Sequence, residues 1–559
     1  MLKKSLCLLM GLAMFFSMAG CSLKKTTTSD VWSDEYVSGN TGTGGNASGD
    51  STDTSGGTDG NTSGNKNNNG KNDNKNNSNS SGTVVTRPTK KQQEMLSYTP
   101  VPESGANYNV KGSVTIAVNS AETVDYEAMF DVMQQLYPNV QIKYDYYSLT
   151  GDDPVMEYLT TRSATGKMAD IILYDRSVLP TKIMQGWVYP ITKLFNADPN
   201  KGNVSDKLVK DYTYCGELYA LPTSCSFDCE IFNVDLLNKL GLKAPGLTWT
   251  WDDYEKYIKA AADKYISGLC VAKENVDEVA TRYAWWLSMC ANGRKDNRFG
   301  QWGYDLNTNQ IVADYLVKGA KEQYEWATMK AGISAFYENN QKDSSGKSKL
   351  EVNMGMTSGL WEAGKVLVKS TNTGGANATG KKYNFNYKIC PTPNTNGQVS
   401  MHVDCCYMTT AVKPENVEAA YQLLRFMTFS DNGNLARLTM YEDSQKGKYK
   451  LNTRIYYPAT TSKVVLDKFS SLSVVTDVDK YFVENIPNAS RFDVHKLVPN
   501  MYRTFNKNVG TQFNAVRDGQ DDGSGLNEAI TKWNAEIKKQ IDNMNTQILK
   551  AQKEFNASH

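Results

Sequence analysis

Polar side chains suited to hydrogen bonding follow two short apolar runs, residues 114–118 and 170–174. The candidates are Asn119, Ser120 and Glu122 after the first run, and Tyr174, Asp175 and Arg176 at the end of the second. Amides, hydroxyls and carboxylates bond the polar groups of a ligand, while an aromatic ring offers it a flat apolar face. If the runs are parallel strands, these side chains lie at carboxyl ends, where ligands of such sheets bind. The pattern predicts a binding site on these two loops.

Histidine, a frequent residue in acid–base catalysis and metal binding, is scarce. The 559 residues contain three histidines, His402, His495 and His559, and no Gly-x-Ser-x-Gly elbow. We therefore expect no catalytic residue, no metal site and no cofactor. A secreted glycoside hydrolase stays an open alternative, because two carboxyl groups about 5 to 9.5 Å apart would suffice and a sequence does not give that distance.

Two local patterns approach known ligand loops without completing them. Residues 359–366 nearly match the phosphate-binding pattern, but Val366 stands where a metal-binding hydroxyl is needed. Residues 518–528 approach a calcium loop, but the last acidic residue comes one position early and Gln520 replaces an acid. We expect no ATP site, and calcium near 518–528 remains open.

The elements that position the candidate residues follow from hydrophobic periodicity. The expected elements are a strand at 114–118, a helix over 126–136 that Pro138 ends, a strand over 140–146, a helix around 155–159 and a strand at 170–174. This β-α-β-α-β order with short connections predicts a parallel sheet covered by helices. A further amphipathic helix is expected over 526–549.

The N-terminus carries the pattern of an export signal. Lys3 and Lys4 precede an apolar run, residues 6–16, which is too short to cross a bilayer. Met18-Ala-Gly-Cys21 then resembles the bacterial lipobox, in which the Cys is lipidated and becomes the first mature residue. We expect a signal peptide over 1–20, a lipid on Cys21, and a location on the extracytoplasmic face of the cell membrane.

The segment after Cys21 is predicted to be a disordered tether over 21–111, because residues 38–82 contain no aliphatic or aromatic side chain larger than Ala. The remainder exceeds one compact core and predicts two domains. A net charge of +1 gives no footprint for nucleic acid. Eight cysteines lie in this remainder; we expect buried thiols, with one or two disulfides left open.

An ordered set of motifs resembles the extracellular solute-binding proteins of family 1, the sugar-binding lipoproteins of ATP-driven importers. The motifs are Tyr137-Pro-Asn-Val-Gln-Ile142, Ala169-Asp-Ile-Ile172, Gly186-Trp-Val-Tyr-Pro190, Tyr219-Ala-Leu-Pro222, Phe232-Asn233, Leu240-Gly-Leu-Lys-Ala-Pro245, Thr248-Trp-Thr-Trp-Asp252, Asn353-Met-Gly-Met-Thr-Ser-Gly-Leu-Trp361, Ile389-Cys-Pro-Thr-Pro393 and Glu418-Ala-Ala-Tyr-Gln-Leu-Leu-Arg-Phe-Met427. They cover about 112–430, and the resemblance fades after about 445.

The resemblance implies an α/β fold of two lobes, with mainly parallel sheets joined by hinge strands and a ligand cleft between them. It implies one lobe from 112–224 with 406–455, and another from 228–403 with 460–559. Crossings are then expected near 223–228, near 402–406 and around 450–460, the first two side by side. Lobe closure on a ligand would be a hinge motion.

The resemblance also implies further site residues. They are Trp361 as an aromatic platform with one open face, Ser224, Ser226 and Asp228 at the first crossing, and one ring of the pair Trp285 and Trp286. Relatives bond sugar hydroxyls from the loop that holds Asp175 and Arg176.

The function implied is non-catalytic capture of a carbohydrate, expected to be an oligosaccharide, for delivery to the membrane permease of an ABC importer. A glycoside hydrolase and a same-fold receptor for another solute are the alternatives. An Arg-lined cleft would favour an anion, and an aromatic-rich cleft would favour a sugar.

Overall fold

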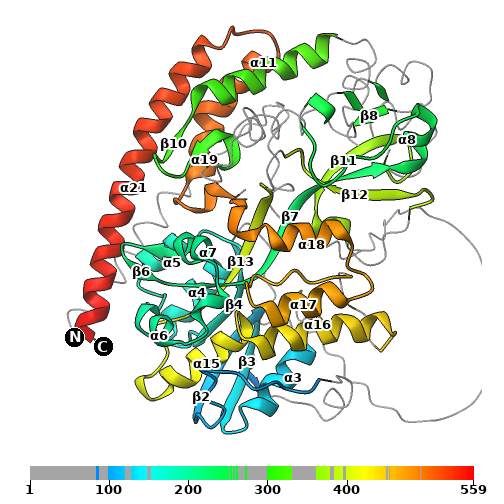
Figure 1. Ribbon diagram of the computed structural model, residues 1–559. Coiled ribbons are helices and arrows are strands. Elements are labelled where there is room, and N and C mark those ends of the chain that lie inside the picture. The colour runs from blue at the N-terminus through cyan, green and yellow to red at the C-terminus, as the bar shows by residue number, and fades with distance from the viewer. Residues whose placement is uncertain are drawn as a thin grey trace, which may run out of the picture. The chain divides into compact units, whose positions relative to one another are not determined.

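A mixed ten-stranded sheet organises the described part of the computed structural model (Figure 1). Its order is β1-β3-β2-β4-β13-β7-β11-β8, with β12 beside β7 and β14 beside β13. The strands are β1 (Val84–Thr86), β2 (Gly112–Asn119), β3 (Val140–Tyr147), β4 (Ile171–Asp175), β7 (Leu221–Asn233), β8 (Val271–Lys273), β11 (Val366–Asn372), β12 (Tyr387–Pro391), β13 (Ser400–Met408) and β14 (Ser490–Arg491). Two short hairpins add β5 (Thr213–Tyr214) with β6 (Glu217–Leu218), and β9 (Tyr304–Asp305) with β10 (Gln310–Ile311).

The chain divides into two units, residues 1–38 and 39–559, and every described residue belongs to the second. The structure describes residues 84–86, 98–119, 127–147, 153–250, 252–254, 256–257, 260–261, 271–273, 299–329, 361–377, 383–394, 398–448, 451, 454–491 and 493–558. The predicted signal peptide and Cys21 lie outside these ranges.

The predicted β-α-β-α-β start is confirmed. Strand β2 pairs in parallel with β3 along its whole length and with β4 at Ile116 and Ala117. Helix α3 (Glu127–Leu136) ends just before Pro138, as expected. Helix α4 (Pro154–Ala164) begins after Asp153, whose carboxylate accepts a hydrogen bond from the Met156 backbone N–H at 2.8 Å. Periodicity and caps therefore account for this part of the sheet.

Two long strands join the two parts of the sheet, β1–β4 on one side and β8, β11 and β12 on the other (Figure 1). Strand β7 pairs with β13 over its first half and with β11 and β12 over its second half. The two segments expected to run side by side do so, with Ser224 opposite Asp404 and Ser226 opposite His402.

A third segment, around 455–460, lies against the same strand. The Cys225 backbone N–H donates to the Tyr457 carbonyl at 3.2 Å, and the Tyr456 hydroxyl donates to the Thr223 carbonyl at 2.7 Å. The third crossing expected in this region therefore also meets β7. The described cysteines, which include Cys225 and Cys405, are all free thiols.

Helices cover the sheet. The remaining ones are α5 (Leu179–Met184), α6 (Thr192–Ala197), α7 (Asp206–Asp211), α8 (Val234–Leu240), α11 (Ala313–Met329), α14 (Thr373–Ala376), α15 (Val417–Met427), α16 (Asp431–Gln445), α17 (Lys463–Ser471), α18 (Asp477–Glu484), α19 (Met501–Phe505), α20 (Thr511–Arg517) and α21 (Ser524–Ser558). Helix α15 packs on β2 and β13, and α16 packs on α3. Among the described helices, none has both the length and the apolarity that a membrane crossing requires.

The chain joins the fold earlier than the sequence predicts. Glu103 forms an ion pair with the fully buried Arg425 at 2.9 Å, and Arg425 also pairs with Asp198 at 2.9 Å. Further back, β1 adds an edge strand to β3, with Val85 opposite Tyr144. The expected tether, which ran to residue 111, is therefore too long.

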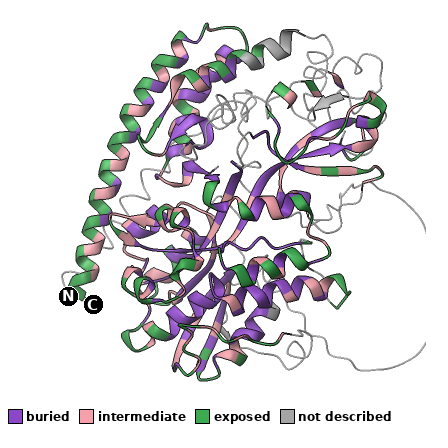
Figure 2. Ribbon diagram, viewed as in Figure 1, coloured by how far each residue is buried: buried purple, intermediate pink, exposed green. Residues whose placement is uncertain are grey.

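The predicted C-terminal helix is confirmed and is longer than expected, since α21 contains 35 residues. Figure 2 shows buried positions recurring along one side of it. Its buried residues are Leu526, Ile530, Trp533, Ile537, Met544 and Ile548.

Trp533 meets Phe505 edge to face, and Phe505 stacks on Trp302 with ring centroids 3.9 Å apart. His495 packs against this aromatic group, and its Nδ1 donates a hydrogen bond to the Gln301 side-chain oxygen at 3.0 Å.

Burial, with Lys496 as a smaller cause, lowers the pKa of His495 from 6.5 to about 3. Between those two values the unfolded chain binds a proton that the folded chain does not. Stability is therefore fully present above pH 6.5 and falls as the pH drops toward 3, by up to about 1.4 kcal/mol per pH unit for this one proton. His495→Gln removes the group, so the free energy of unfolding should fall less steeply with acid.

Urea unfolding of both proteins at pH 6.5 and pH 5 measures this difference, since every other titrating group is shared. Equal pH slopes in the two proteins would show that His495 is not the buried neutral group described above.

Candidate functional site

A row of polar side chains lies on one face of the ribbon formed by β7 and β13. Because side chains alternate along a strand, Ser224, Ser226 and Asp228 share a face of β7. The register places Asp404 and His402 directly opposite the first two. The face is half-buried at positions 224, 226, 402 and 404, whereas the intervening residues on both strands are buried.

Asp228 anchors one end of this face. It is 1% exposed, accepts a hydrogen bond from the Ser400 hydroxyl, and lies 3.3 Å from His402 Nε2. Strand β11 ends here as well, because Asn372 is opposite Asp228 in the register. The expectation that the Asp228 carboxylate faces a ligand is therefore wrong in this structure, since its oxygens are used inside the ribbon.

Arg176 joins the other end of the face. Its Nε lies 3.7 Å from Asp404 Oδ1, and Ser224 Oγ donates to Asp404 Oδ2 at 3.4 Å. Its guanidinium also sits over the Tyr174 ring, 4.4 Å from the centroid, and Nη2 donates to the Tyr174 hydroxyl at 2.7 Å. The arginine side chain is 34% exposed, so it can still present donors to a ligand.

Tyr174 has a left-handed backbone, with φ of 69°. Such a conformation costs a residue with a side chain of the order of 1–3 kcal/mol and persists where surrounding contacts enforce it. Here the flanking residues Leu173 and Asp175 are both buried, which fixes the chain on either side. The turn directs the end of β4 toward β13, where Arg176 meets Asp404.

Asp175 lies beneath this corner in a closed ionic network. It is 2% exposed and accepts hydrogen bonds from the Ser177 backbone N–H at 2.8 Å and the Tyr407 hydroxyl at 3.0 Å. Lys182, which is fully buried on α5, lies 3.6 Å from Asp175 and 2.7 Å from Asp153. The Ser177 hydroxyl also contacts Asp175 and Lys182.

Burial alone would raise the pKa of Asp175, but Lys182 and the hydrogen bonds from Ser177 and Tyr407 lower it below its ordinary value. At Asp153 burial outweighs Lys182, so that pKa is raised. The charge of Asp175 is thus balanced within the protein. The expectation that Asp175 bonds a ligand is wrong in this structure, because its carboxylate holds the loop in place instead.

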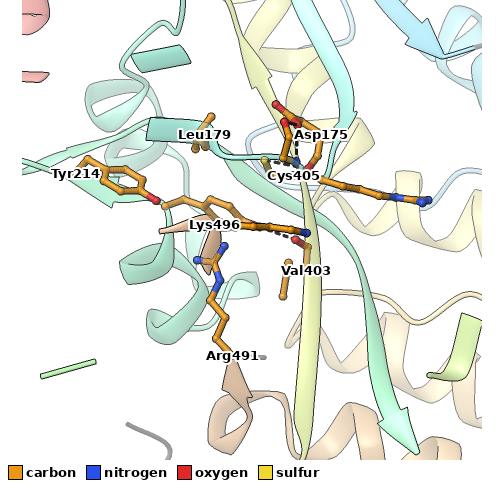
Figure 3. A pocket seen from close by; sticks show the side chains of 10 residues that line it. Asp175, Leu179, Tyr214, Val403, Cys405, Arg491 and Lys496 are labelled. Carbon is orange, nitrogen blue, oxygen red and sulfur yellow. Dashed lines mark hydrogen bonds between the residues drawn. The ribbon is translucent and has the colours of Figure 1, made fainter. Parts of the chain in front are cut away.

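A small cavity lies beside β13, in the gap between the end of β4 and the end of β14 (Figure 3). Its lining residues are Asp175, Arg176, Ser177, Leu179, Tyr212, Tyr214, Val403, Cys405, Arg491 and Lys496. With about 10 Å³ it has room for a single water molecule. A small-molecule site needs about 300 Å³ or more, so this cavity does not itself hold a solute.

Two of the three basic side chains at this cavity, Arg491 and Lys496, are held by one carboxylate. Asp493 is 1% exposed and pairs with Arg491 Nε at 2.8 Å and with Lys496 Nζ at 3.1 Å. Burial alone would raise the pKa of Asp493, but Lys496 and Arg491 lower it far below its ordinary value. Because Arg176 likewise pairs with Asp404, the cations around the candidate site each have an acidic partner.

Trp361 does not have the open face that the sequence predicts. It is fully buried, and Tyr383 and Phe385 meet it edge to face at 5.6 and 5.1 Å. It also precedes β11, near Gly364, whose carbonyl accepts from the Asn233 side chain at the far end of β7. The whole of β11 separates it from Asp228, so Trp361 is a core residue at the wrong end of the strand.

The other predicted residues fall into two groups. Asn119 ends β2 opposite Tyr147 and is half-buried. Because β2 pairs in parallel with β4, it lies at the same edge of the sheet as Tyr174, and its contact with a ligand stays a prediction. Ser120, Glu122, Trp285 and Trp286 lie outside the described residues.

Sequence reasoning missed several residues that the structure adds. Asp404 and His402 lie within the predicted crossing, and their alternation opposite Ser224 and Ser226 could have identified them. Arg491 and Lys496 had no such signal, because the resemblance to known motifs ends before them.

The family profile of the bacterial extracellular solute-binding proteins matches residues 119–433, more than half of the chain. Binding proteins of Brucella abortus and Brucella suis are 27% identical over 176 residues, which are 31% of this chain and 42% of theirs. The chain thus spans less than half the length of these curated relatives.

Solved structures share the fold. An ABC substrate-binding protein of Listeria monocytogenes in complex with cycloalternan has 16% identity and a TM-score of 0.50, over 77% of this chain and 99% of that one. A sugar transporter of Rhizobium etli in an open conformation has 15% identity and a TM-score of 0.51, over 76% and 99%. The GacH receptor of Streptomyces glaucescens, solved unliganded and with acarbose, has 16% identity and a TM-score of 0.51, over 78% and 99%. The α/β fold of two lobes is confirmed.

The ionic network beneath the site gives a stability prediction. Lys182→Met leaves the buried Asp175 and the half-buried Asp153 without their cation, which should lower the free energy of unfolding by about 3–5 kcal/mol. The matched control is Lys463→Met, whose side chain is 84% exposed and pairs with Asp467 at the surface. It should change stability by less than about 1 kcal/mol. Denaturant titrations of the three proteins measure both effects, and similar losses in the two variants would contradict the network.

Proposed function

The chain belongs to the bacterial extracellular solute-binding proteins, and on that premise we propose that it captures a carbohydrate, in particular an oligosaccharide, without altering it. The observation that carries this proposal is the face of the β7–β13 ribbon, where Arg176 and Asp404 form a partly exposed ion pair beside the Tyr174 ring. Paired charges offer several strong hydrogen bonds without net charge, which suits an uncharged ligand rich in hydroxyls. An aromatic ring beside them suits the apolar face of a sugar.

The proteins of similar fold support the same ligand class. Their structures hold cycloalternan, acarbose and, for a cyclo/maltodextrin-binding protein with 16% identity and a TM-score of 0.52, maltotetraose. The balance of charge around the site argues against an anionic solute, since Arg491 and Lys496 are already held by Asp493.

The proposed site lies at the carboxyl end of β4 and on the half-buried positions of the ribbon. It comprises Tyr174, Arg176, Ser224, Ser226, His402 and Asp404. Lobe 1 would contain 112–224 and 406–455, extended by the docked residues 98–111, and lobe 2 would contain 228–403 and 460–559. The ligand would enter by a hinge motion about β7 and β13, since the neighbouring cavity has room for only one water molecule.

Two further parts of the proposal concern the cell surface. A lipid on Cys21 would anchor the protein to the extracytoplasmic face of the membrane, with the following residues as a tether. The loaded protein would then deliver its ligand to the membrane permease of an ABC importer, the partner that its family implies.

The glycoside hydrolase remains the rival that a test has to address. Two carboxylates near the site, Asp175 and Asp228, are buried and already hydrogen-bonded to neighbours. They support a structural role better than an acid–base role.

The purified mature chain should show a raised thermal midpoint with at least one oligosaccharide of a carbohydrate library, because a ligand of the folded state stabilises it by mass action. Chromatography of the same mixture should recover the sugar unshortened. Shortened sugar would favour the hydrolase, and no shift with any carbohydrate would favour another solute.

Two variants measured in the same screen test the site, one within it and one control. Arg176→Ala should weaken binding of the best sugar by about 10- to 100-fold, since a charge-assisted hydrogen bond contributes roughly 1.5–3 kcal/mol. The exposed Arg503→Ala should bind as the parent does.

The anchor has its own test. Cys21→Ser should move the protein from the membrane fraction of expressing bacteria to the soluble extracytoplasmic fraction, because it removes the thiol that would carry the lipid. Cys215→Ser is the matched control and should stay with the membrane. Membrane retention of the Cys21 variant would contradict lipidation at that residue.

A further inference from the structure

The C-terminal helix α21 contacts elements of both proposed lobes. Figure 1 shows it running from the region of α11 and α19 to that of α5 and β6. It packs on α11, α20 and β10 with its first half and on α5 with its second half. We infer that α21 is a strap whose second half docks and undocks as the lobes move, and that its docking positions the loop of the binding site.

The first half of the strap is fixed in an apolar core. Leu526, Ile530, Trp533 and Ile537 are each at most 1% exposed. Asn534 adds two hydrogen bonds to the backbone of Ile311 on β10, at 2.8 and 3.0 Å. Separating this half would expose a tryptophan and three large aliphatic side chains to water, so it stays with its lobe.

The second half is held by fewer and more polar contacts. Met544 and Ile548 are its buried side chains, and Phe555 meets Tyr189 edge to face at 4.9 Å. Gln552 donates to the carbonyls of Tyr214 and Cys215 at 3.3 and 3.4 Å. Part-buried hydrogen bonds between neutral groups are exchanged for water at small net cost, so this half is the one that can release.

Cys215 lies under the second half of α21, so the reactivity of its thiol can be used to measure whether this half is docked. Its thiol contacts the backbone carbonyl and side-chain oxygen of Asn545 at 3.7 and 3.6 Å. Cys215 sits in the tight turn between β5 and β6, where it and Gly216 have φ values of 47° and 85°, as the favoured two-residue hairpin turn requires. Partial burial raises the pKa of this thiol, which makes it less reactive while α21 is docked.

The second half also touches the support of the binding site. It packs on α5, and α5 carries Lys182, which bonds Asp175 and Ser177 in the loop that presents Arg176. Docking of α21 on α5 therefore stabilises the conformation of this loop. Because coupling between two sites is reciprocal, a ligand that fixes the loop would in turn favour docking.

This inference rests on the proposed capture of a solute between two lobes, but its test needs no solute. In the full mature chain, deletion of residues 541–559 should speed amide hydrogen exchange of the segment 174–184 by about three- to tenfold, as local opening becomes easier. Exchange in α11 should stay as in the parent. Unchanged exchange at 174–184, or equal acceleration in α11, would overturn the strap.

Point variants provide a second test of the inference in case the shortened chain does not fold. Phe555→Ala and Gln552→Ala should each raise the rate of Cys215 alkylation by iodoacetamide about three- to tenfold, measured by mass spectrometry of the Cys215 peptide. Leu549→Ala removes a side chain that is 54% exposed on the same half of the helix and should leave the rate unchanged. Equal rates in all variants would overturn the inference, while failure of the carbohydrate screen would leave it standing.

Discussion

The antiparallel pairing of β7 with β13 is the constraint on which the rest of this fold depends. One strand passes unbroken from the first part of the sheet into the second, so both parts share a continuous set of backbone hydrogen bonds. A swivel between the parts must therefore bend these strands rather than separate them. The same pairing places Ser224 opposite Asp404 and Ser226 opposite His402, so the connection between the parts is also the polar surface between them.

Charges near this ribbon are neutralised in pairs, and the depth of each pair decides its role. Lys182 with Asp175 is fully buried and holds the end of β4 in a strained turn. Arg176 with Asp404 is partly exposed and loses less hydration, so it can exchange its bond for a ligand. The buried ion pair thus supports the loop, and the partly exposed ion pair is the candidate contact for a ligand.

Hydrophobic periodicity in the sequence predicted the first strands and helices. Which side chains form the candidate site depends on how distant strands pair in the fold. The periodicity of 114–175 was enough for β2, α3, β3, α4 and β4, because each is amphipathic or buried and has a clear end signal. The crossings of β7 and β13 came from the resemblance and not from periodicity. Trp361 was placed wrongly because a motif does not show which end of β11 faces the ribbon. Burial of Asp175 was missed because its partner Lys182 belongs to a different element, and only the fold brings the two together.

The distribution of apolar contact separates the rigid parts of this structure from the movable ones. Helix α21, with 35 residues, is about 50 Å long and behaves as a rod over that length. If the two proposed lobes rotate about β7, a rod fixed at Trp533 cannot follow both of them unless its other end is free to leave its partner. The contacts of the two halves of α21 differ in this way. Buried aromatic rings surround Trp533 in the first half, whereas Gln552 in the second half donates to backbone carbonyls. Hydrogen bonds of that kind re-form with water or protein at similar free energy, which is the property that a repeated opening and closing requires.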